Sequence, residues 1–323
     1  MEVRLARHGN RIIAEPDCVP GLLDFPLWRR HAVYHRICQQ TYEAKDAGPP
    51  SELTETGIEV LPGLLAAGDG EHLSDLATSV LEEDAENIVG NRADYNDLTL
   101  SDAFRNAIIE RLPKILSEPT VAHLEQHFGC HFRIDTVSAF RTLPVPVPEV
   151  SFLWHRDVAP MSQVHIMVYL TGSGPGSGQT SFLSLAQTRD AAHVGYHYPD
   201  IRERSDDIAA TLEPTSVTPE VICPLVRPGD GLAFSSARVL HRGHLPSEGF
   251  RDVMIIVLLP SFAPWHQDIE DFGTDHMFLH ASKSTLKTNP YHPLMPNIEE
   301  EMDLNLIPDE PWIIEGELYP PDL

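Results

Sequence analysis

Apolar residues recur at every fourth position in several segments of the first third of the chain. The pattern occurs within residues 33–42, again within 104–112, and as a shorter stripe within 121–128. Spacing of three to four residues places apolar side chains on one face of an α-helix. Ser101 stands where a helix N-cap is expected, and Gly129 where a left-handed C-terminal cap is expected. The pattern therefore predicts a helical N-terminal part over residues 1–130.

From about residue 131 the pattern changes to short runs rich in Val, Ile, Phe and Thr that are separated by Pro and Gly. Such runs are typical of an all-β sandwich or barrel. The Gly-rich segment 172–178 predicts a flexible loop, and the PGDG sequence at 228–231 predicts a tight turn between two strands. The expected strands are 131–142, 151–157, 163–171, 179–184, 217–226, 231–236 and 252–259. We therefore expect a mainly β core over residues 131–260.

The predicted strand 163–171 has a pattern that indicates burial on both faces. One face carries Val164, Ile166, Val168 and Leu170, and the other carries Gln163, His165, Met167 and Tyr169. Burial of both faces fits the wall of a barrel. Two interpretations of the second face remain open. Either His165, Tyr169 and nearby Thr180 contact a cofactor or substrate, or they pack in the core.

Beyond Pro260 the regular pattern is lost. Residues 288–323 contain seven Pro and nine acidic residues but no Lys or Arg, which disfavours regular structure. The apolar stretch 312–314 indicates that the Pro-rich, acidic C-terminal extension (261–323) lies along the body of the protein. We expect a single domain over residues 1–323, made of the helical part, the β core and this extension.

The composition is that of an ordinary globular protein with a strongly acidic surface. The 323 residues are 42% hydrophobic and 22% charged, and 48 acidic side chains outnumber 23 Lys and Arg for a formal net charge of −25. Such a surface repels phosphate backbones and anionic lipid headgroups, so nucleic acids and membrane surfaces are disfavoured as partners. If an anion binds, local arginines must supply the positive charge.

Neither the N-terminus nor the cysteines indicate export. Residues 1–20 contain no apolar stretch of signal-peptide length, and the longest aliphatic run, Val253–Leu259, is too short to span a bilayer. The four cysteines, at positions 18, 38, 130 and 223, form no C-x-x-C pair. Buried thiols are therefore expected rather than disulfides or a zinc ribbon, and we expect a cytoplasmic protein.

The strongest chemical signal is the sequence His155-x-Asp157. Because a β-strand returns to the same face at every second residue, the two side chains are expected to point together. An imidazole and a carboxylate, joined by a second distant histidine, form the facial triad of non-haem iron(II) oxygenases, which leaves adjacent metal positions open. His241 follows the predicted strand 231–236 and is the preferred third ligand. His155, Asp157 and His241 are therefore the candidate metal ligands and catalytic residues.

Arg251 lies ten residues after His241, at the start of the aliphatic run that ends at Leu259. It could form a surface ion pair with one of the many acids, or it could point inward and bind a carboxylate bidentately. Its place at the start of a predicted core strand favours the second interpretation. The distal carboxylate of a 2-oxo acid whose other end chelates iron is a suitable ligand. Arg251 is therefore the candidate cosubstrate-binding residue.

Other histidines offer weaker alternatives for the metal site. The H-x-D pair at 266–268 is followed by neither a strand pattern nor an arginine, so we interpret it as surface or packing residues. The H-x-E pair at 123–125 lies in a predicted helix, where residues two apart do not face each other. His244 competes with His241 for the third position, but the preceding strand and the offset to Arg251 favour His241.

Several motifs within residues 150–260 together resemble those of a known family. They are WHRD at 154–157, VYLT at 168–171, SGQTSF at 177–182, RPGDGLAF at 227–234, and the H-x9-R unit from His241 to Arg251. As a set they are similar to the phytanoyl-CoA-dioxygenase-like branch of the iron(II)- and 2-oxoglutarate-dependent oxygenases. The resemblance implies a double-stranded β-helix (jelly roll) with flanking helices. It also implies that His155, Asp157 and His241 hold Fe(II) and that Arg251 holds 2-oxoglutarate.

The resemblance further implies an oxidoreductase, a dioxygenase that uses O2 to hydroxylate a small-molecule substrate with formation of succinate and CO2. Two other classes remain open. One is a non-oxygenase jelly roll, either a cupin-like metal isomerase or a catalytically silent binding protein. The other is a partner-binding protein that acts through its acidic tail. Arg251 discriminates against the isomerase, which needs no arginine at that offset. The substrate, the choice among hydroxylation, desaturation and cyclisation, and the oligomeric state are left open.

Overall fold

The computed structural model describes residues 50–83, 95–174 and 176–278. It also describes short pieces at 5–8, 11–14, 31, 34–35, 38–39, 42–43, 313–314 and 317–318. The predicted helix at 33–42 falls partly within these pieces. Tyr34 and Cys38 are helical and buried, whereas Val33, Ile37 and Thr41 lie outside the described residues.

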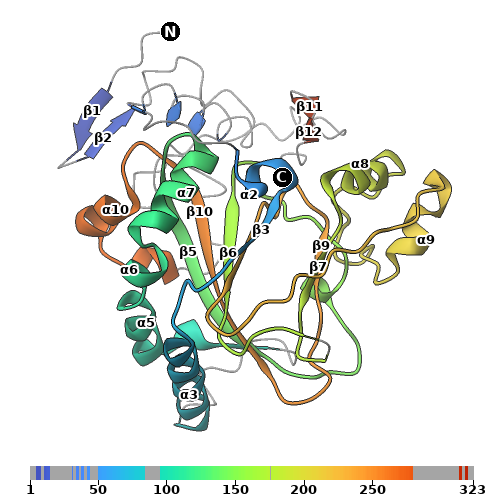
Figure 1. Cartoon of the computed structure of the whole chain (residues 1–323), viewed down its shortest axis with the longest axis horizontal. Helices are drawn as coiled ribbons and strands as arrows, with labels where there is room; N and C mark the ends of the chain where they lie inside the picture. Colours follow the sequence, from blue (N-terminus) through green and yellow to red (C-terminus); the bar gives the residue numbers. More distant parts are fainter. Residues whose placement is uncertain are drawn as a thin grey trace.

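A six-stranded antiparallel sheet forms the centre of the described part (Figure 1). In order across the sheet the strands are β3 (Ile58–Leu61), β8 (Gly231–Phe234), β6 (Val164–Tyr169), β10 (Arg251–Ser261), β5 (His131–Thr142) and β4 (Tyr95–Asp97). Each strand is antiparallel to its neighbours. The long strands β5 and β10 pair from Arg251 opposite Thr142 to Ser261 opposite His131.

A second, smaller sheet pairs β7 (Thr180–Phe182) with β9 (His241–Gly243). Bridge residues widen it on both sides, since His155 pairs with His241 and Ile222 pairs with Phe182. From β5 onward the chain passes repeatedly between the two sheets, so neighbouring strands are distant in sequence. Two antiparallel sheets connected in this way form a double-stranded β-helix. The expected jelly roll is thus confirmed.

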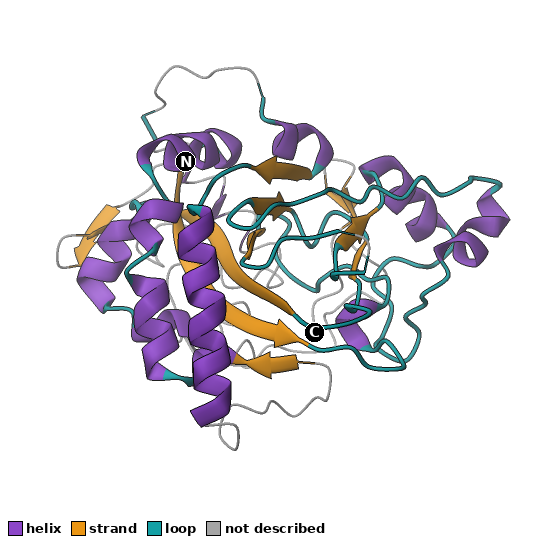
Figure 2. Cartoon of the chain, turned by 60° about the horizontal axis from the view of Figure 1, so that its bottom comes forward, coloured by secondary structure: helices purple, strands orange, loops and turns teal. Residues whose placement is uncertain are grey.

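Helices cover the outer face of the large sheet (Figure 2). They are α3 (Ala67–Glu83), α5 (Asp102–Ile109), α6 (Leu112–Ile115), α7 (Glu118–Phe128) and α10 (Trp265–Phe272). Ser101 caps α5 by accepting from the Phe104 N–H, and Gly129 ends α7 in the left-handed region at φ 65°. Pro113 lies in the first turn of α6, where its missing N–H is tolerated. The predicted helix over 104–112 is therefore divided into two.

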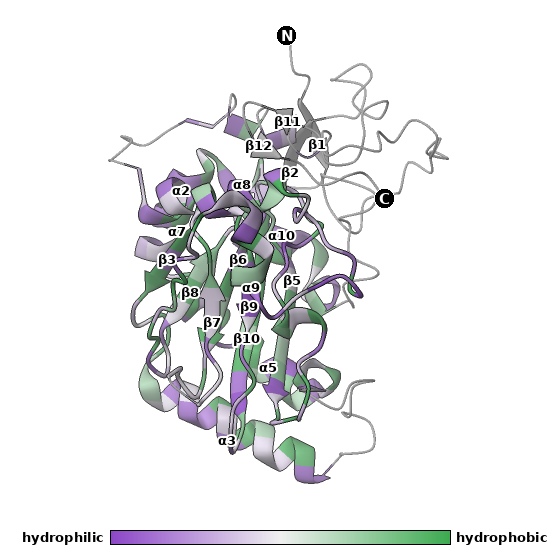
Figure 3. Ribbon diagram, turned by 90° about the vertical axis from the view of Figure 1, so that its right-hand side faces the viewer, coloured by the Kyte–Doolittle hydropathy of each residue, from purple (hydrophilic) through white to green (hydrophobic). Residues whose placement is uncertain are grey.

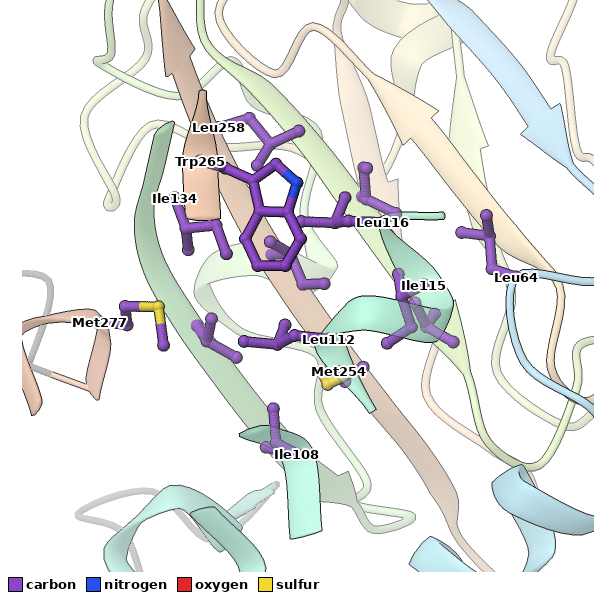
Figure 4. Packing of buried hydrophobic residues seen from close by; sticks show 14 of the residues in the cluster. Leu64, Ile108, Leu112, Ile115, Leu116, Ile134, Met254, Leu258, Trp265 and Met277 are labelled. Atoms are coloured by element: carbon purple, nitrogen blue, oxygen red, sulfur yellow. The ribbon is translucent and has the colours of Figure 1, made fainter. Parts of the chain in front are cut away.

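Alternation along the strands separates two buried layers. On the outer face, Ile166 of β6 and Met254 of β10 belong to the cluster that packs against the helices, where Figure 4 shows Trp265 beside Leu258. On the inner face, Tyr169 of β6 packs in a second cluster between the two sheets, with residues that include Met167, Phe182 and Phe234. The expected burial of both faces of this strand is confirmed.

The remaining elements surround these layers. They are α2 (Glu52–Thr56), α8 (Leu185–His193), α9 (Ile208–Leu212), the 3-10 helices Leu98–Leu100, Val150–Phe152, Glu213–Thr215 and Asp275–Phe278, and the strand pairs β1 (Leu5–His8) with β2 (Arg11–Ala14) and β11 (Ile313–Ile314) with β12 (Glu317–Leu318). Figure 3 shows hydrophilic and hydrophobic residues alternating along α3. None of the helices in the described residues has the length and apolar character needed to cross a bilayer.

Two of the predicted strands are wrong. Within 151–157 only His155 forms a bridge. The Asp157 N–H donates to the carbonyl of Ser236, which lies in a turn after β8, so this segment does not continue as a strand. Within 217–226 only Ile222 forms a bridge. Pro219 and Pro224 flank it and cannot donate to a strand ladder.

The described residues of the C-terminal extension contain more regular structure than the sequence pattern suggests. The helix α10 begins five residues after Pro260, and the two-residue strands β11 and β12 pair within the stretch expected to lack regular structure. Burial of Trp265 against the outer face of the large sheet explains the helix, since an amphipathic segment gains most of its stability from packing.

Candidate metal centre

The bridge between His155 and His241 brings two distant parts of the chain together. The backbone N–H of each residue donates to the carbonyl of the other, at 3.0 and 2.9 Å. Directly opposed residues of an antiparallel pair carry their side chains on the same face. The centroids of the two imidazole rings accordingly lie 4.3 Å apart. Pairing within the small sheet therefore places the two histidines side by side.

Both imidazoles are oriented by the backbone that precedes them. Nδ1 of His155 lies 2.7 Å from the carbonyl oxygen of Leu153, and Nδ1 of His241 lies 3.0 Å from that of Val239. Because a carbonyl oxygen only accepts, each Nδ1 carries a proton and donates it. In the neutral ring this leaves the lone pair on Nε2, which is the arrangement found in metal-binding histidines.

Asp157 completes the group. Its Oδ1 lies 3.5 Å from Nε2 of His155. One possible ligand atom from each of Asp157, His155 and His241 lies within 4.8 Å of the others, so these described residues could together hold a metal ion. The Asp157 side chain is 32% exposed and that of His155 only 5%, so the carboxylate lies on the more accessible side of the group.

Burial and mutual proximity set the protonation state of these three side chains. Burial, together with the charge of His241, lowers the pKa of His155 to about 3, and burial also lowers the pKa of His241. Burial of Asp157 opposes its ionisation, but the imidazoles beside it lower the pKa of its carboxyl to about 2. At neutral pH the group therefore presents two neutral imidazoles and one carboxylate, which is the state that binds a divalent metal.

Arg251 is buried at the start of β10, with 2% of its surface exposed. Its Nη1 donates to the carbonyl of Gly178 at 3.1 Å, its Nη2 donates to the hydroxyl of Thr142 at 3.3 Å, and its Nε has no hydrogen-bond partner. Among the described residues, no Asp or Glu forms an ion pair with this guanidinium. A surface ion pair, the alternative considered for Arg251, is therefore wrong.

The lack of a side chain at Gly178 leaves space for the side chain of Arg251. Gly178 has φ 80°, and a Cβ atom at this position would lie 3.1 Å from Cδ of Arg251. Nearby, the buried hydroxyls of Tyr169 and Thr180 lie 2.8 Å apart. Burial raises the pKa of Tyr169, and the charge of Arg251 opposes that rise. Tyr169 thus lies close enough to Arg251 for its charge to act on the phenol, and Thr180 is the hydrogen-bond partner of Tyr169.

The weaker histidine candidates lie elsewhere. On α10, His266 is exposed while Asp268 is buried, so the two side chains do not converge. On α7, Nε2 of His123 pairs with Glu59 at 2.9 Å rather than with a metal-binding neighbour. Nε2 of His244 lies 2.7 Å from the hydroxyl of Ser181. Only His241 of these histidines joins His155 and Asp157 in the described group.

Two buried polar residues of the interior were missed by the sequence analysis. Arg133 of β5 is fully buried, and Gln163, just before β6, is 3% exposed. The signal for Arg133 was a charged residue between Phe132 and Ile134 in a predicted core strand, where an unpaired charge is costly. Gln163 was predicted to lie on the same strand face as His165, but the sequence gives no indication of which residue forms a hydrogen bond with it.

No family model matches the chain, and no curated protein matches it. Solved structures with a similar fold include the 2-oxoglutarate-dependent epimerase SnoN from nogalamycin biosynthesis, at 14% identity over 71% of this chain and 84% of that chain, with a TM-score of 0.45. The carbocyclase SnoK from the same biosynthesis has 16% identity over 68% and 92%, with a TM-score of 0.47. EctD from S. alaskensis, crystallised with 2-oxoglutarate and 5-hydroxyectoine, has 17% identity over 68% and 79%, with a TM-score of 0.45. At these identities the similarity concerns the fold, and the chemistry of this chain has to be argued from its own residues.

Proposed function

We propose that this chain is an Fe(II)/2-oxoglutarate-dependent dioxygenase that hydroxylates a small molecule with formation of succinate and CO2. The observation that carries this proposal is that a metal-binding group and a buried arginine occur inside the same barrel. Two neutral imidazoles and a carboxylate converge at one point, and a buried arginine of the same interior has no carboxylate partner within the part of the chain that the structure describes. The motif set favours the phytanoyl-CoA-dioxygenase-like branch of these enzymes.

The donor set fits iron(II). Two histidines and one carboxylate on one side of a metal leave positions open on the other side, which is the arrangement of non-haem Fe(II) oxygenases. His155 and His241 would bind through Nε2, since their Nδ1 atoms donate to backbone carbonyls. Asp157 would supply the carboxylate. The backbone hydrogen bonds hold both rings in position before the metal arrives, which reduces the entropy lost on binding.

Arg251 fits the distal carboxylate of 2-oxoglutarate. A buried guanidinium without an internal carboxylate is stabilised by a bidentate anionic ligand. When bound, Fe(II) and 2-oxoglutarate supply the activation of O2 and the oxidising power for hydroxylation. The chain's own residues hold the ion, orient the cosubstrate and exclude water. The last task falls to the apolar inner wall that includes Met167, Phe182 and Phe234.

The first test measures metal binding. Purified protein should retain about one Fe(II) per chain in anaerobic equilibrium dialysis, and His155→Ala, Asp157→Ala and His241→Ala should each weaken binding because each removes one of three ligands. His266→Ala is the matched control, since His266 is exposed on α10, and it should behave like the parent. Equal retention of iron in all four variants and the parent would contradict the assignment.

The second test measures the reaction. On exposure to O2, the iron-loaded protein should convert 2-oxoglutarate to succinate, and a substrate from a metabolite panel should increase the rate. Metal binding without any loss of 2-oxoglutarate would favour the silent jelly roll or the metal isomerase instead.

A further inference from the structure

Arg133 points into the interior from the end of the barrel opposite to Arg251. On β5, Phe132 and Ile134 belong to the cluster that packs against the helices, so the alternate residue Arg133 faces the inner side. It lies opposite Leu259 of β10, whereas Arg251 lies at the other end of that strand, opposite Thr142. A register shift between Val257 and Leu258 marks a bulge next to this position.

One edge of the Arg133 guanidinium has no partner. Nη1 donates to Oδ1 of Asp135 at 3.0 Å, but within the part of the chain that the structure describes no atom accepts from Nε or Nη2. The side chain is 0% exposed. Buried donors are almost always hydrogen-bonded in folded proteins. Two unpartnered donors on one edge of a fully buried guanidinium therefore point to a ligand.

A second arginine in the same sheet shows which kind of group the Nε–Nη2 edge of a guanidinium binds. Nε and Nη2 of Arg141 donate to the two carboxylate oxygens of Asp252, at 2.7 and 2.6 Å. These are the same two atoms that lack acceptors in Arg133. They form a planar fork that matches the spacing of two carboxylate oxygens. The ligand that best completes Arg133 is therefore a carboxylate.

Further polar groups connect this position with the metal centre. Nε2 of His165 lies 3.8 Å from Oδ2 of Asp157, and the amide nitrogen of Gln163 lies 2.7 Å from the same His165 atom. The other amide atom of Gln163 is buried without a partner. Either orientation of this amide leaves one polar group available to a ligand. In the sheet, Gln163 precedes Val164, which pairs with Leu258, and the next residue of that strand, Leu259, lies opposite Arg133.

We infer that Arg133 binds the carboxylate of the substrate, and that the substrate class is a carboxylate-bearing small molecule. The inference rests on the proposed function, since it assigns the substrate end of the same interior. The two arginines then bind different carboxylates. Arg251 binds that of the cosubstrate at one end of β10, and Arg133 binds that of the substrate near the other end of this strand. Gln163 contributes a further hydrogen bond to the bound molecule.

The test uses acetate as the probe and acetamide as its neutral isostere. Both are added to anaerobic protein loaded with Fe(II) and saturated with 2-oxoglutarate, so that Arg251 is occupied, and binding is measured by saturation-transfer NMR. In the parent the acetate signal should exceed that of acetamide by at least about fivefold, because a charge-assisted bidentate pair is much stronger than a neutral hydrogen bond. The methyl protons of acetate should also relax faster with Fe(II) than with Zn(II), since the proposal places the subsite in the same interior as the metal.

Arg133→Gln should reduce the acetate signal to the level of acetamide while the affinities for Fe(II) and 2-oxoglutarate stay unchanged. Should this variant fail to fold because Asp135 loses its partner, Arg133→Gln combined with Asp135→Asn removes both charges and makes the same prediction. Arg227→Gln, which changes an exposed arginine, is the control and should match the parent. Equal signals for the two probes in the parent, or an acetate signal that survives both Arg133 variants, would overturn the assignment.

Failure of the proposed function gives a different result. If the parent binds neither Fe(II) nor 2-oxoglutarate, the same titration is made without them in an Arg251→Gln background, which removes the competing arginine. An acetate signal that depends on Arg133 then supports the carboxylate subsite in a protein of another function. Its absence overturns the subsite as well.

Discussion

Arg141 and Arg251 are two buried arginines at the same end of the β5–β10 pair, and they differ in the groups that pair with their guanidinium. Arg141 lies opposite Asp252, the residue next to Arg251, so the two guanidinium groups belong to opposite faces of one sheet. On the outer face Arg141 forms a bidentate pair with Asp252, which also accepts from the hydroxyl of Ser74 at 2.6 Å. On the inner face Arg251 donates to a carbonyl and a hydroxyl among the described residues, and its guanidinium lies 5.9 Å from the centroid of the Phe152 ring.

The difference distinguishes an arginine whose charge is paired within the chain from one that we propose binds a ligand. The charge of Arg141 is compensated within the chain, and its amino group also donates to the hydroxyl of Thr78 on α3, so it fastens that helix to the sheet. Arg251 is also buried but forms no ion pair with an acid among the described residues, and we propose that a bound carboxylate compensates its charge. Breaking the first pair should reduce stability, and changing the second arginine should reduce affinity.

The largest effect is expected from Asp252→Asn. The change leaves the Arg141 charge buried without a carboxylate, and removal of one partner of a buried pair costs about 3 to 5 kcal/mol of unfolding free energy. Denaturant unfolding followed by circular dichroism measures this loss. Glu110→Gln makes the same chemical change at an exposed position and should alter stability by less than about 0.5 kcal/mol. Similar values for the two variants would remove the structural role of the Arg141–Asp252 pair.

Arg251→Gln should do the opposite. It removes the fork that we propose holds the cosubstrate, so the affinity for 2-oxoglutarate should fall by roughly 30-fold, equivalent to about 2 kcal/mol. The unfolding free energy should change by less than about 1 kcal/mol, because no internal carboxylate loses its partner. Titration calorimetry with Fe(II) present measures the first quantity and denaturant unfolding the second. An unchanged dissociation constant for 2-oxoglutarate would show that Arg251 does not bind it.

Gly178→Ala tests the space around Arg251. The new methyl group would lie 3.1 Å from Cδ of Arg251 and 3.0 Å from the carbonyl oxygen of His244. The affinity for 2-oxoglutarate should fall by roughly fivefold, about 1 kcal/mol, because the arginine must shift. Gly195→Ala is a matched control, since Gly195 also has positive φ but no atom within 4 Å of an added Cβ. Both variants should lose about 1 to 2 kcal/mol of stability, and an equal loss of affinity in both would contradict the steric explanation.

The smallest effect concerns the ionisation of His244. Burial, together with the charges of Arg242 and Arg251, lowers the pKa of His244 to about 4. In Arg251→Gln the pKa of His244 should therefore rise, whereas the exposed Arg227→Gln should leave it unchanged. NMR of the imidazole protons against pH measures the change. A His244 pKa that is equal in parent and Arg251→Gln would place the two groups too far apart to interact.

The same shift has a consequence for stability. The pKa of His244 is lower in the folded than in the unfolded protein, so its contribution to stability is fully present above about pH 6.5 and is lost as the pH falls toward 4. Because Arg251→Gln brings the two pKa values closer, the stability of that variant should decline less steeply over this range. Denaturant unfolding at a series of pH values between these limits measures the difference.

Local patterns in the sequence were sufficient for much of the fold. The strand at 131–142 and the caps at Ser101 and Gly129 match the structure, because alternation and capping depend on neighbouring residues. The bridge at His155 and the helix α10 were not predicted as such. Both depend on distant contacts, the first with His241 and the second with the outer face of the large sheet.

Within the site, the H-x-D spacing and the strand before His241 were enough to predict that His155, Asp157 and His241 come together. The inward position predicted for Arg251 agrees with its burial, and its binding of 2-oxoglutarate stays a prediction. The sequence alone could not distinguish Arg133, Arg141 and Arg251, since each is a single charged residue in or beside an apolar run. Strand register decided their roles: it placed Asp252 opposite Arg141 on the outer face. Among the described residues, Arg133 pairs with Asp135 through Nη1 alone, and Arg251 forms no ion pair with an acid. Whether a buried charge is compensated depends on long-range pairing, and no local pattern encodes that pairing.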